Sequence, residues 1–236
     1  MRAPRPDNRP AAPLQPVDRI IDALALLLAG AAVTARIAAV SALIAFVIAV
    51  PLGLGRSSAR AWVRVAAGAY VEFFRGTSLV VQLFWLYFVL PQLGLRLDAI
   101  TAAIIGISLN YGAYGAEVVR GAISSVAAGQ VLAAQSLGLS KGMVMRHVIM
   151  PQAMTVFVRP WGNLMIQLLK ATSLVSLITI ADLTYRAYQL HQLTLKTLPI
   201  FGMVLAMYFV MAQAIALATA LADRRFGQWR LRGAAT

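Results

Sequence analysis

Long apolar stretches separated by short polar segments are the main pattern of the sequence. Since about 20 consecutive apolar residues form a helix that crosses a bilayer, each long stretch predicts a transmembrane helix. We expect about five such helices, over residues 35–54, 77–95, 99–118, 154–180 and 199–221. The sequence therefore predicts an all-α polytopic membrane protein with a transmembrane domain over residues 19–222.

The first apolar stretch, residues 20–54, is longer than one crossing requires. Asp22, Thr34 and Arg36 interrupt it. We expect an amphipathic segment over about 18–33 that lies at the membrane interface, followed by the first span. Two spans within this stretch are the alternative, but they would need a turn near Thr34 with almost no loop.

The polar regions lie at both ends of the chain and between the predicted spans. Residues 1–18 are rich in Pro, Arg and Ala without a helical period, which predicts a disordered tail. Residues 223–236 contain several arginines and are expected to form a C-terminal tail in the cytoplasm. Arg56, Arg60 and Arg64 predict a basic loop before the second span.

The composition agrees with a membrane protein. Hydrophobic residues make up 60% of the chain and charged residues 12%, whereas soluble domains have roughly 45–50% apolar and about 25% charged residues. The sequence has no Cys, which excludes disulfides and thiolate metal sites, and its two His residues lie far apart. We therefore expect no metal and no cofactor bound by this chain.

The net charge of +13 is explained by membrane topology. Lys and Arg accumulate in loops that remain in the cytoplasm, and no basic stretch forms a separate domain that would favour nucleic acid. The richer loops place residues 119–153 and the C-terminus in the cytoplasm, and residues 181–198 outside. Five spans then put the N-terminal arginines outside, against this rule, and a sixth span would remove the conflict.

The segment between the third and fourth predicted spans has the pattern of two short helices joined by a turn. Gly138 can adopt the left-handed conformation that stops a helix, and Ser140 can cap the next helix. Pro151 is expected to end that second helix. This pattern predicts a short cytoplasmic helix that could bind a partner, or a re-entrant hairpin without one.

This segment resembles the conserved cytoplasmic loop of the permease subunits of ATP-binding-cassette (ABC) importers. Two alanines, a glycine and a proline match that loop, and Leu132 stands where a glutamate is usual. Residues 70–83, 113–121 and 170–184 also resemble permeases of the histidine/glutamine type, which take up polar amino acids. The residues of the expected coupling segment are Gly129, Leu132, Ala133, Ala134, Leu137, Gly138, Ser140 and Pro151.

The resemblance implies a permease subunit that moves a polar amino acid or a related small solute across the inner membrane of a bacterium. It also implies three partners: a cytoplasmic ABC ATPase dimer docked on the short helix, a second permease copy or a sister permease, and an external solute-binding protein. The ATPase subunits would use the ATP, because this chain has no Gly-x-x-x-x-Gly-Lys-Ser/Thr phosphate-binding loop.

Polar residues within the predicted spans are candidates for the solute path, since ionisable groups at membrane depth usually face a cavity or a partner. Asn110, Tyr114 and Glu117 are spaced four and three apart and share one helical face. The alternatives are hydrogen bonding between helices, a Glu117–Arg120 pair, and a Lys170 side chain that extends along the apolar surface to reach water. The candidate path residues are Gln82, Asn110, Tyr114, Glu117, Lys170, Ser173 and Asp182.

Two other functions remain open from the sequence alone. A proton- or sodium-coupled carrier working without partners would fit the spans, but the internal repeat that is common in such carriers is not visible. An intramembrane enzyme would need clustered His, Asp or Ser side chains, and no Gly-x-Ser-x-Gly motif occurs. We therefore expect a transport subunit that is not an enzyme.

Overall fold

The computed structural model describes residues 16–233, and within this range every regular element is a helix. The all-α class is therefore confirmed. Two π-helical turns, Trp85–Val89 and Met145–Ile149, and two 3-10 helices, Leu90–Leu93 and Thr172–Ile178, adjoin the α-helices. In chain order the α-helices are α1 (Pro16–Arg56), α2 (Ala61–Gly76), α3 (Leu79–Phe84), α4 (Ala99–Ser124), α5 (Ala128–Ser136), α6 (Lys141–Val144), α7 (Met150–Ala171), α8 (Leu183–Thr194) and α9 (Thr197–Gly233).

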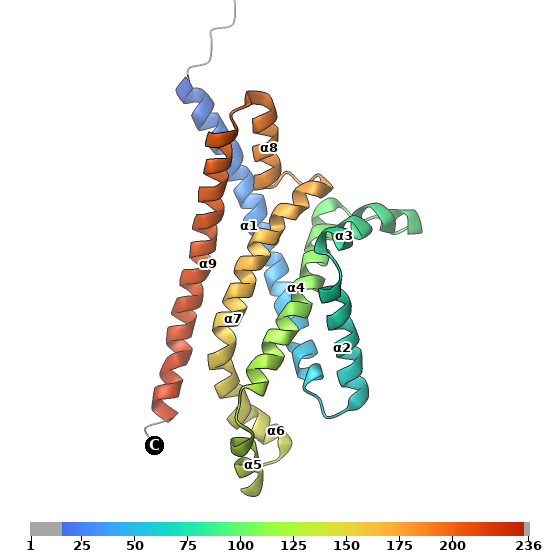
Figure 1. Ribbon diagram of the computed structural model, residues 1–236, viewed down its shortest axis with the longest axis vertical. Coiled ribbons are helices and arrows are strands. Elements are labelled where there is room, and N and C mark those ends of the chain that lie inside the picture. The colour runs from blue at the N-terminus through green and yellow to red at the C-terminus, as the bar shows by residue number, and fades with distance from the viewer. Residues whose placement is uncertain (1–15, 234–236) are drawn as a thin grey trace, which may run out of the picture.

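The long helices α1, α4, α7 and α9 run along the long axis of an elongated bundle (Figure 1). The short helices α5 and α6 lie at one end of this bundle, as does the C-terminal end of α9. Helix α8 and the N-terminal part of α1 lie at the opposite end. The two polar segments that the sequence assigned to opposite sides of a membrane thus lie at opposite ends of the molecule.

The first apolar stretch forms one continuous helix, α1, of 41 residues. The predicted interfacial segment over 18–33 with a separate span after it is therefore wrong. Thr34 is fully buried, and its hydroxyl accepts a hydrogen bond from the backbone N–H of Leu183 at 3.1 Å. A polar residue that predicted a break instead joins α1 to α8. Residues 16–18 of the predicted tail belong to α1, and residues 1–15 lie outside the described part of the chain.

The segment predicted to be a basic loop after Arg56 is largely helical. Helix α2 buries Ala67, Gly68 and Val71 against the bundle, so the arginines mark only the start of an amphipathic helix. Helix α2 and the helical segment Leu79–Leu93 then meet at an angle of 97°. The predicted second span is therefore the second half of a broken helix and not one straight crossing.

Two predicted helix ends are also wrong. Pro151 lies in the first turn of α7, directly after the π-helical turn Met145–Ile149, and the chain remains helical through it. The π-helical turn directly before it, in which the Met150 N–H bonds to the Met145 carbonyl, locally replaces the α-helical hydrogen-bond pattern, so the proline does not end the helix. At the end of the chain, α9 continues to Gly233, so residues 223–233 extend the last helix and do not form a separate tail.

Three of the described helices are long and apolar enough to cross a membrane, namely Ala23–Arg56, Ala99–Ser124 and Thr197–Arg225. Two bent pairs bring the number to five if each pair counts as one span: α2 with Leu79–Leu93, and Lys141–Ile178 with α8. A polytopic membrane protein is therefore confirmed, and the number of five spans stays a prediction.

Small residues let α1, α4 and α7 approach closely in the core. A Cβ added to Gly112 would lie 2.7 Å from a methyl carbon of Ile48. A Cβ added to Gly115 would lie 2.7 Å from both the Ala49 Cβ and a ring carbon of Trp161. These glycines therefore fix the distance between the central helices, as expected of small residues in membrane bundles.

Candidate functional site

The break between α2 and α3 is held by two of the predicted path residues. The Gln82 amide donates to the Phe74 carbonyl at 3.1 Å and to the Thr77 hydroxyl at 2.6 Å. The Asn110 amide donates to the same Phe74 carbonyl at 2.9 Å and to the Gln82 side-chain oxygen at 3.2 Å. A broken helix leaves carbonyls without partners, and these two amides satisfy them from α3 and α4. The structure thus brings Gln82 and Asn110 together.

Tyr114 and Glu117 lie on the same face of α4, toward the α5 end of the bundle. The Arg75 guanidinium lies 5.2 Å from the centroid of the Tyr114 ring, within the range of a cation–π contact. Glu117 pairs with Arg120 at 2.7 Å and with Arg56 of α1 at 3.1 Å. The Glu117–Arg120 pair, given above as the alternative to a path role, is therefore present. This cluster joins α1, α2 and α4.

A polar stripe runs along the outer face of α7. Asn163, Gln167 and Lys170 are spaced four and three apart, and all three side chains are exposed. Lys170 is a candidate from the sequence, whereas Asn163 and Gln167 were not predicted, although their spacing relative to Lys170 was the signal that could have indicated them. Polar side chains on a spanning helix are costly in lipid, so this face requires water or protein opposite it.

The remaining two path candidates use their polar atoms within the chain. The Ser173 hydroxyl donates to the Lys170 carbonyl at 2.8 Å. Asp182 is fully buried and caps α8, because one carboxylate oxygen accepts a hydrogen bond from the Tyr185 N–H at 2.9 Å. Arg186 donates to the backbone carbonyl of Ala181 at 3.2 Å. In this conformation Ser173 is half-buried, and Asp182 lies within the bundle and away from the α7 stripe.

The expected coupling segment forms a helix, a turn and a second helix. Gly138 adopts a φ of 82° after α5, and the Ser140 hydroxyl accepts a hydrogen bond from the Met143 N–H at 3.4 Å at the start of α6. Both local predictions are confirmed. Ala134 is buried against the chain itself, whereas Leu132 and Leu137 are 62% and 83% exposed. The segment therefore presents apolar side chains outward at one end of the molecule.

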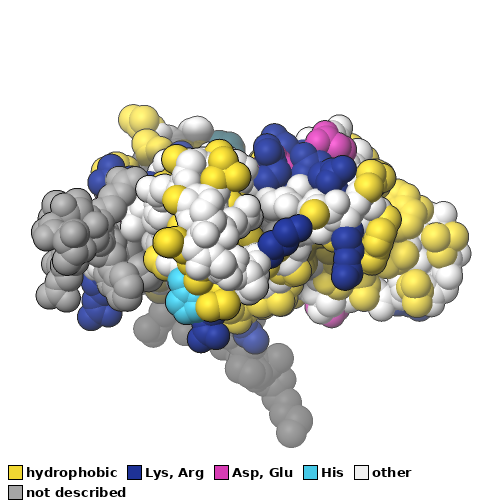
Figure 2. Space-filling view, turned by 90° about the horizontal axis from the view of Figure 1, so that it is seen from below, with side chains coloured by type: hydrophobic (Ala, Val, Ile, Leu, Met, Phe, Trp, Pro, Cys, Tyr) yellow, Lys and Arg dark blue, Asp and Glu magenta, His cyan; other side chains and the backbone are white. Residues whose placement is uncertain are grey.

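The end of the molecule that carries α5 and α6 is rich in basic side chains. Figure 2 shows this end, with Lys and Arg side chains in several places around the surface and few carboxylates among them. One group of basic side chains lies beside carboxylates in this view. A basic end is typical of the cytoplasmic side of a membrane protein.

Comparison with known proteins identifies the family. Residues 41–227 match the model of the family described as binding-protein-dependent transport system inner membrane component. A probable amino-acid ABC transporter permease of Sinorhizobium fredii is 41% identical over 207 residues, which cover 85% of this chain and 87% of that protein. The glutamine transport system permease of Escherichia coli is 34% identical over 205 residues, with 86% of this chain and 94% of that protein covered.

Solved structures give the same result. A crystal structure of an amino acid ABC transporter with histidines has a TM-score of 0.82 at 33% identity, and the match covers 87% of this chain and 96% of that chain. An inward-facing methionine ABC transporter has a TM-score of 0.73 at 20% identity, which supports the fold alone. With most of its length matched by the family model and by these relatives, the chain belongs to the family of binding-protein-dependent transport system inner membrane components.

Proposed function

We propose that this chain is the permease subunit of an ABC importer that moves a polar amino acid across the inner membrane of a bacterium. Relatives whose names give a solute transport glutamine, arginine, octopine or nopaline, and all of these solutes carry amino-acid groups. The chain provides the path, and ATP is hydrolysed by partner subunits, so the chain itself performs no chemistry.

The observation that carries this proposal is the exposed polar stripe of Asn163, Gln167 and Lys170 on α7. A hydrocarbon environment offers these groups no hydrogen bond. A second permease copy, or a sister permease, facing this stripe would enclose water between the two subunits and give a solute a polar route. The route would also pass five other candidate path residues, Gln82, Asn110, Tyr114, Glu117 and Ser173, whereas the fully buried Asp182 lies away from the stripe.

The exposed leucines in and directly after α5 support docking of a cytoplasmic ABC ATPase dimer at this end of the molecule. Leu132 and Leu137 present apolar surface next to the turn at Gly138. Exposed apolar side chains on a short helix can bind in a hydrophobic groove of a partner. This end, with the C-terminus, then lies in the cytoplasm. The opposite end, with α8, faces the external solute-binding protein.

ATP-driven uptake tests this function directly. The complex purified from its own cells is reconstituted in vesicles with the solute-binding protein outside and ATP inside, and uptake of radiolabelled glutamine, arginine and histidine is measured. We expect uptake of at least one of them that requires internal ATP and survives proton and sodium ionophores. Uptake that needs an ion gradient and ignores ATP would show a stand-alone carrier instead.

A further inference from the structure

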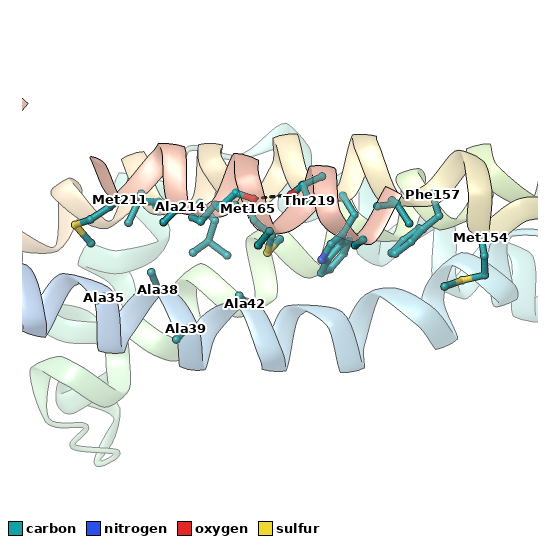
Figure 3. Close-up of a pocket in the computed structure, with 18 residues that line it drawn as sticks. Ala35, Ala38, Ala39, Ala42, Met154, Phe157, Met165, Met211, Ala214 and Thr219 are labelled. Atoms are coloured by element: carbon teal, nitrogen blue, oxygen red, sulfur yellow. Dashed lines mark hydrogen bonds between the residues drawn. The ribbon is translucent and has the colours of Figure 1, made fainter. Parts of the chain in front are cut away.

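An apolar groove with a volume of about 620 Å³ runs between α1, α7 and α9. Figure 3 shows four alanines of α1 on one side of the open space and side chains of α7 and α9 on the other. Helix α9 packs on α7, where Gly162 lies directly against Thr219, and it touches α1 very little. The groove is therefore a gap between three long helices, of which α1 and α9 are long and apolar enough to cross a membrane.

The chemistry of the lining suits a hydrocarbon chain. The lining side chains are apolar except for Thr219 and the indole of Trp161, and the Thr219 hydroxyl already donates to the Ile215 carbonyl at 2.8 Å. Met154, Met165 and Met211 also line the groove, and flexible methionines adapt to ligands of irregular shape. The volume lies within the roughly 300–1,000 Å³ of typical ligand sites, but nothing in the lining would recognise the charges of an amino acid.

A basic residue continues the groove at the α5 end of the bundle. The groove face of α9 contains Met211, Ile215, Ala218 and Ala222, at steps of three and four residues. Arg225 is the next position in this series, so its side chain projects from the same face of α9. Arg225 is exposed, and it follows the groove residue Ala222 by one helical turn on α9. A guanidinium therefore follows directly on the apolar groove face of α9, as is typical of basic residues that flank an apolar segment at a membrane surface.

The groove opens on the side of α7 that is away from the polar stripe. Trp161, Met165 and Leu168 of the groove are each two positions before a residue of that stripe, and two residues correspond to a rotation of about 200° on an α-helix. If a second permease covers the stripe, which is the part of this argument that rests on the proposed function, the groove remains on the side that faces the bilayer.

We propose that this groove is a binding site for an anionic phospholipid of the bilayer. One acyl chain lies between α1 and α9, in contact with Trp161 and the three methionines, and the phosphate pairs with Arg225. An anionic headgroup is favoured because the end of the groove is cationic. The bound acyl chain fills the gap between α1 and α9, and its contacts with both helices stabilise their separation.

Quenching of Trp161 by brominated lipids tests this site. Trp161 stacks on Phe157 at 5.3 Å and forms part of the groove wall. The full chain carrying Trp62→Phe, Trp85→Phe and Trp229→Phe retains only this tryptophan, since the sequence contains four. Its fluorescence is measured in phosphatidylcholine vesicles that contain increasing fractions of phosphatidylglycerol or phosphatidylcholine brominated along the acyl chain.

We expect half-maximal quenching at a roughly fivefold lower fraction of brominated phosphatidylglycerol than of brominated phosphatidylcholine. The factor corresponds to the attraction of one basic residue for an anionic lipid headgroup. Arg225→Gln should abolish this preference, whereas Arg224→Gln, on another face of α9, should keep it. Ala218→Phe, which places a ring in the groove at an exposed position, should weaken quenching by both lipids, and Leu217→Phe beside it should not.

Equal quenching by the two lipids, or a preference that Arg225→Gln leaves unchanged, would overturn the proposal. Quenching by neither lipid, together with a disulfide between two copies that carry Ala39→Cys, would overturn it in favour of a second copy in the groove. The measurement uses neither ATPase nor solute. A failure of ATP-driven uptake with normal lipid quenching would therefore refute the proposed function and leave the lipid site intact.

Discussion

Two leucines at opposite ends of the molecule allow a matched test of the ATPase dock. Leu137, after α5, and Leu193, in α8, are both 83% exposed. If α5 inserts into a groove of the ATPase, the Leu137 side chain becomes buried on docking and Leu193 does not. Leu137→Ala should therefore weaken the binding of the ATPase, and Leu193→Ala should leave it unchanged.

The size of the effect follows from the exposure of the side chain. Full burial of a leucine contributes about 1.5–3 kcal/mol relative to the exposed state, and alanine keeps only part of the apolar surface. We expect a loss of about 1–2 kcal/mol from Leu137→Ala, which corresponds to about 5- to 30-fold weaker binding. Leu132 is 62% exposed, so Leu132→Ala should cost somewhat less.

The assay is the dissociation constant of the purified ATPase for the permease in nanodiscs, measured with ATPase stimulation on the same samples. The Leu193→Ala variant shows whether removal of an exposed leucine has a general effect on the protein. Unchanged affinity for a Leu132→Ala and Leu137→Ala double variant would refute docking on α5. Equal losses for Leu137→Ala and Leu193→Ala would mean that exposure, and not position, determines the result.

Three further predictions concern packing, the broken helix and topology. Gly162→Ala should destabilise the protein by about 1–3 kcal/mol, because its Cβ would overlap Thr219; thermal unfolding should show the loss and its recovery when Thr219→Gly is added. Asn110→Ala removes two hydrogen bonds at the break, and we expect a loss of about 1–3 kcal/mol and reduced uptake, with ATPase stimulation retained. In the naturally cysteine-free chain, Ser140→Cys should react with an impermeant thiol reagent only from the cytoplasm and Leu193→Cys only from outside; the reverse pattern would invert the topology.

Features set by neighbouring residues were predictable from the sequence. The turn at Gly138 and the cap at Ser140 depend on residues within one turn, and both were found as expected. The apolar stretches gave the helical class, because a bilayer requires each spanning segment to satisfy its own backbone. Neither the turn and cap nor the helical class depends on a contact with a residue far away in the sequence.

Features set by distant residues were not predictable in the same way. Thr34 appeared to mark a break in the first helix, but its partner Leu183 lies 149 residues away in the sequence. Gln82 and Asn110 were chosen as path residues, and only the contact of both with the Phe74 carbonyl reveals their role at the break. Asn163 and Gln167 have the helical spacing to Lys170 that could have indicated them, but only the fold shows that this face of α7 is exposed.

Solvent accessibility along α7 is the most direct test of a solute path on the polar stripe. Single variants Gln167→Cys and Met165→Cys, two positions apart, are treated with an impermeant thiol reagent in the assembled transporter, with and without the solute-bound binding protein. We predict that Gln167→Cys reacts and that its rate changes by at least a few-fold during turnover, while Met165→Cys on the apolar side stays unreactive. Reaction at Met165→Cys with protection of Gln167→Cys would contradict a water-filled path along this face.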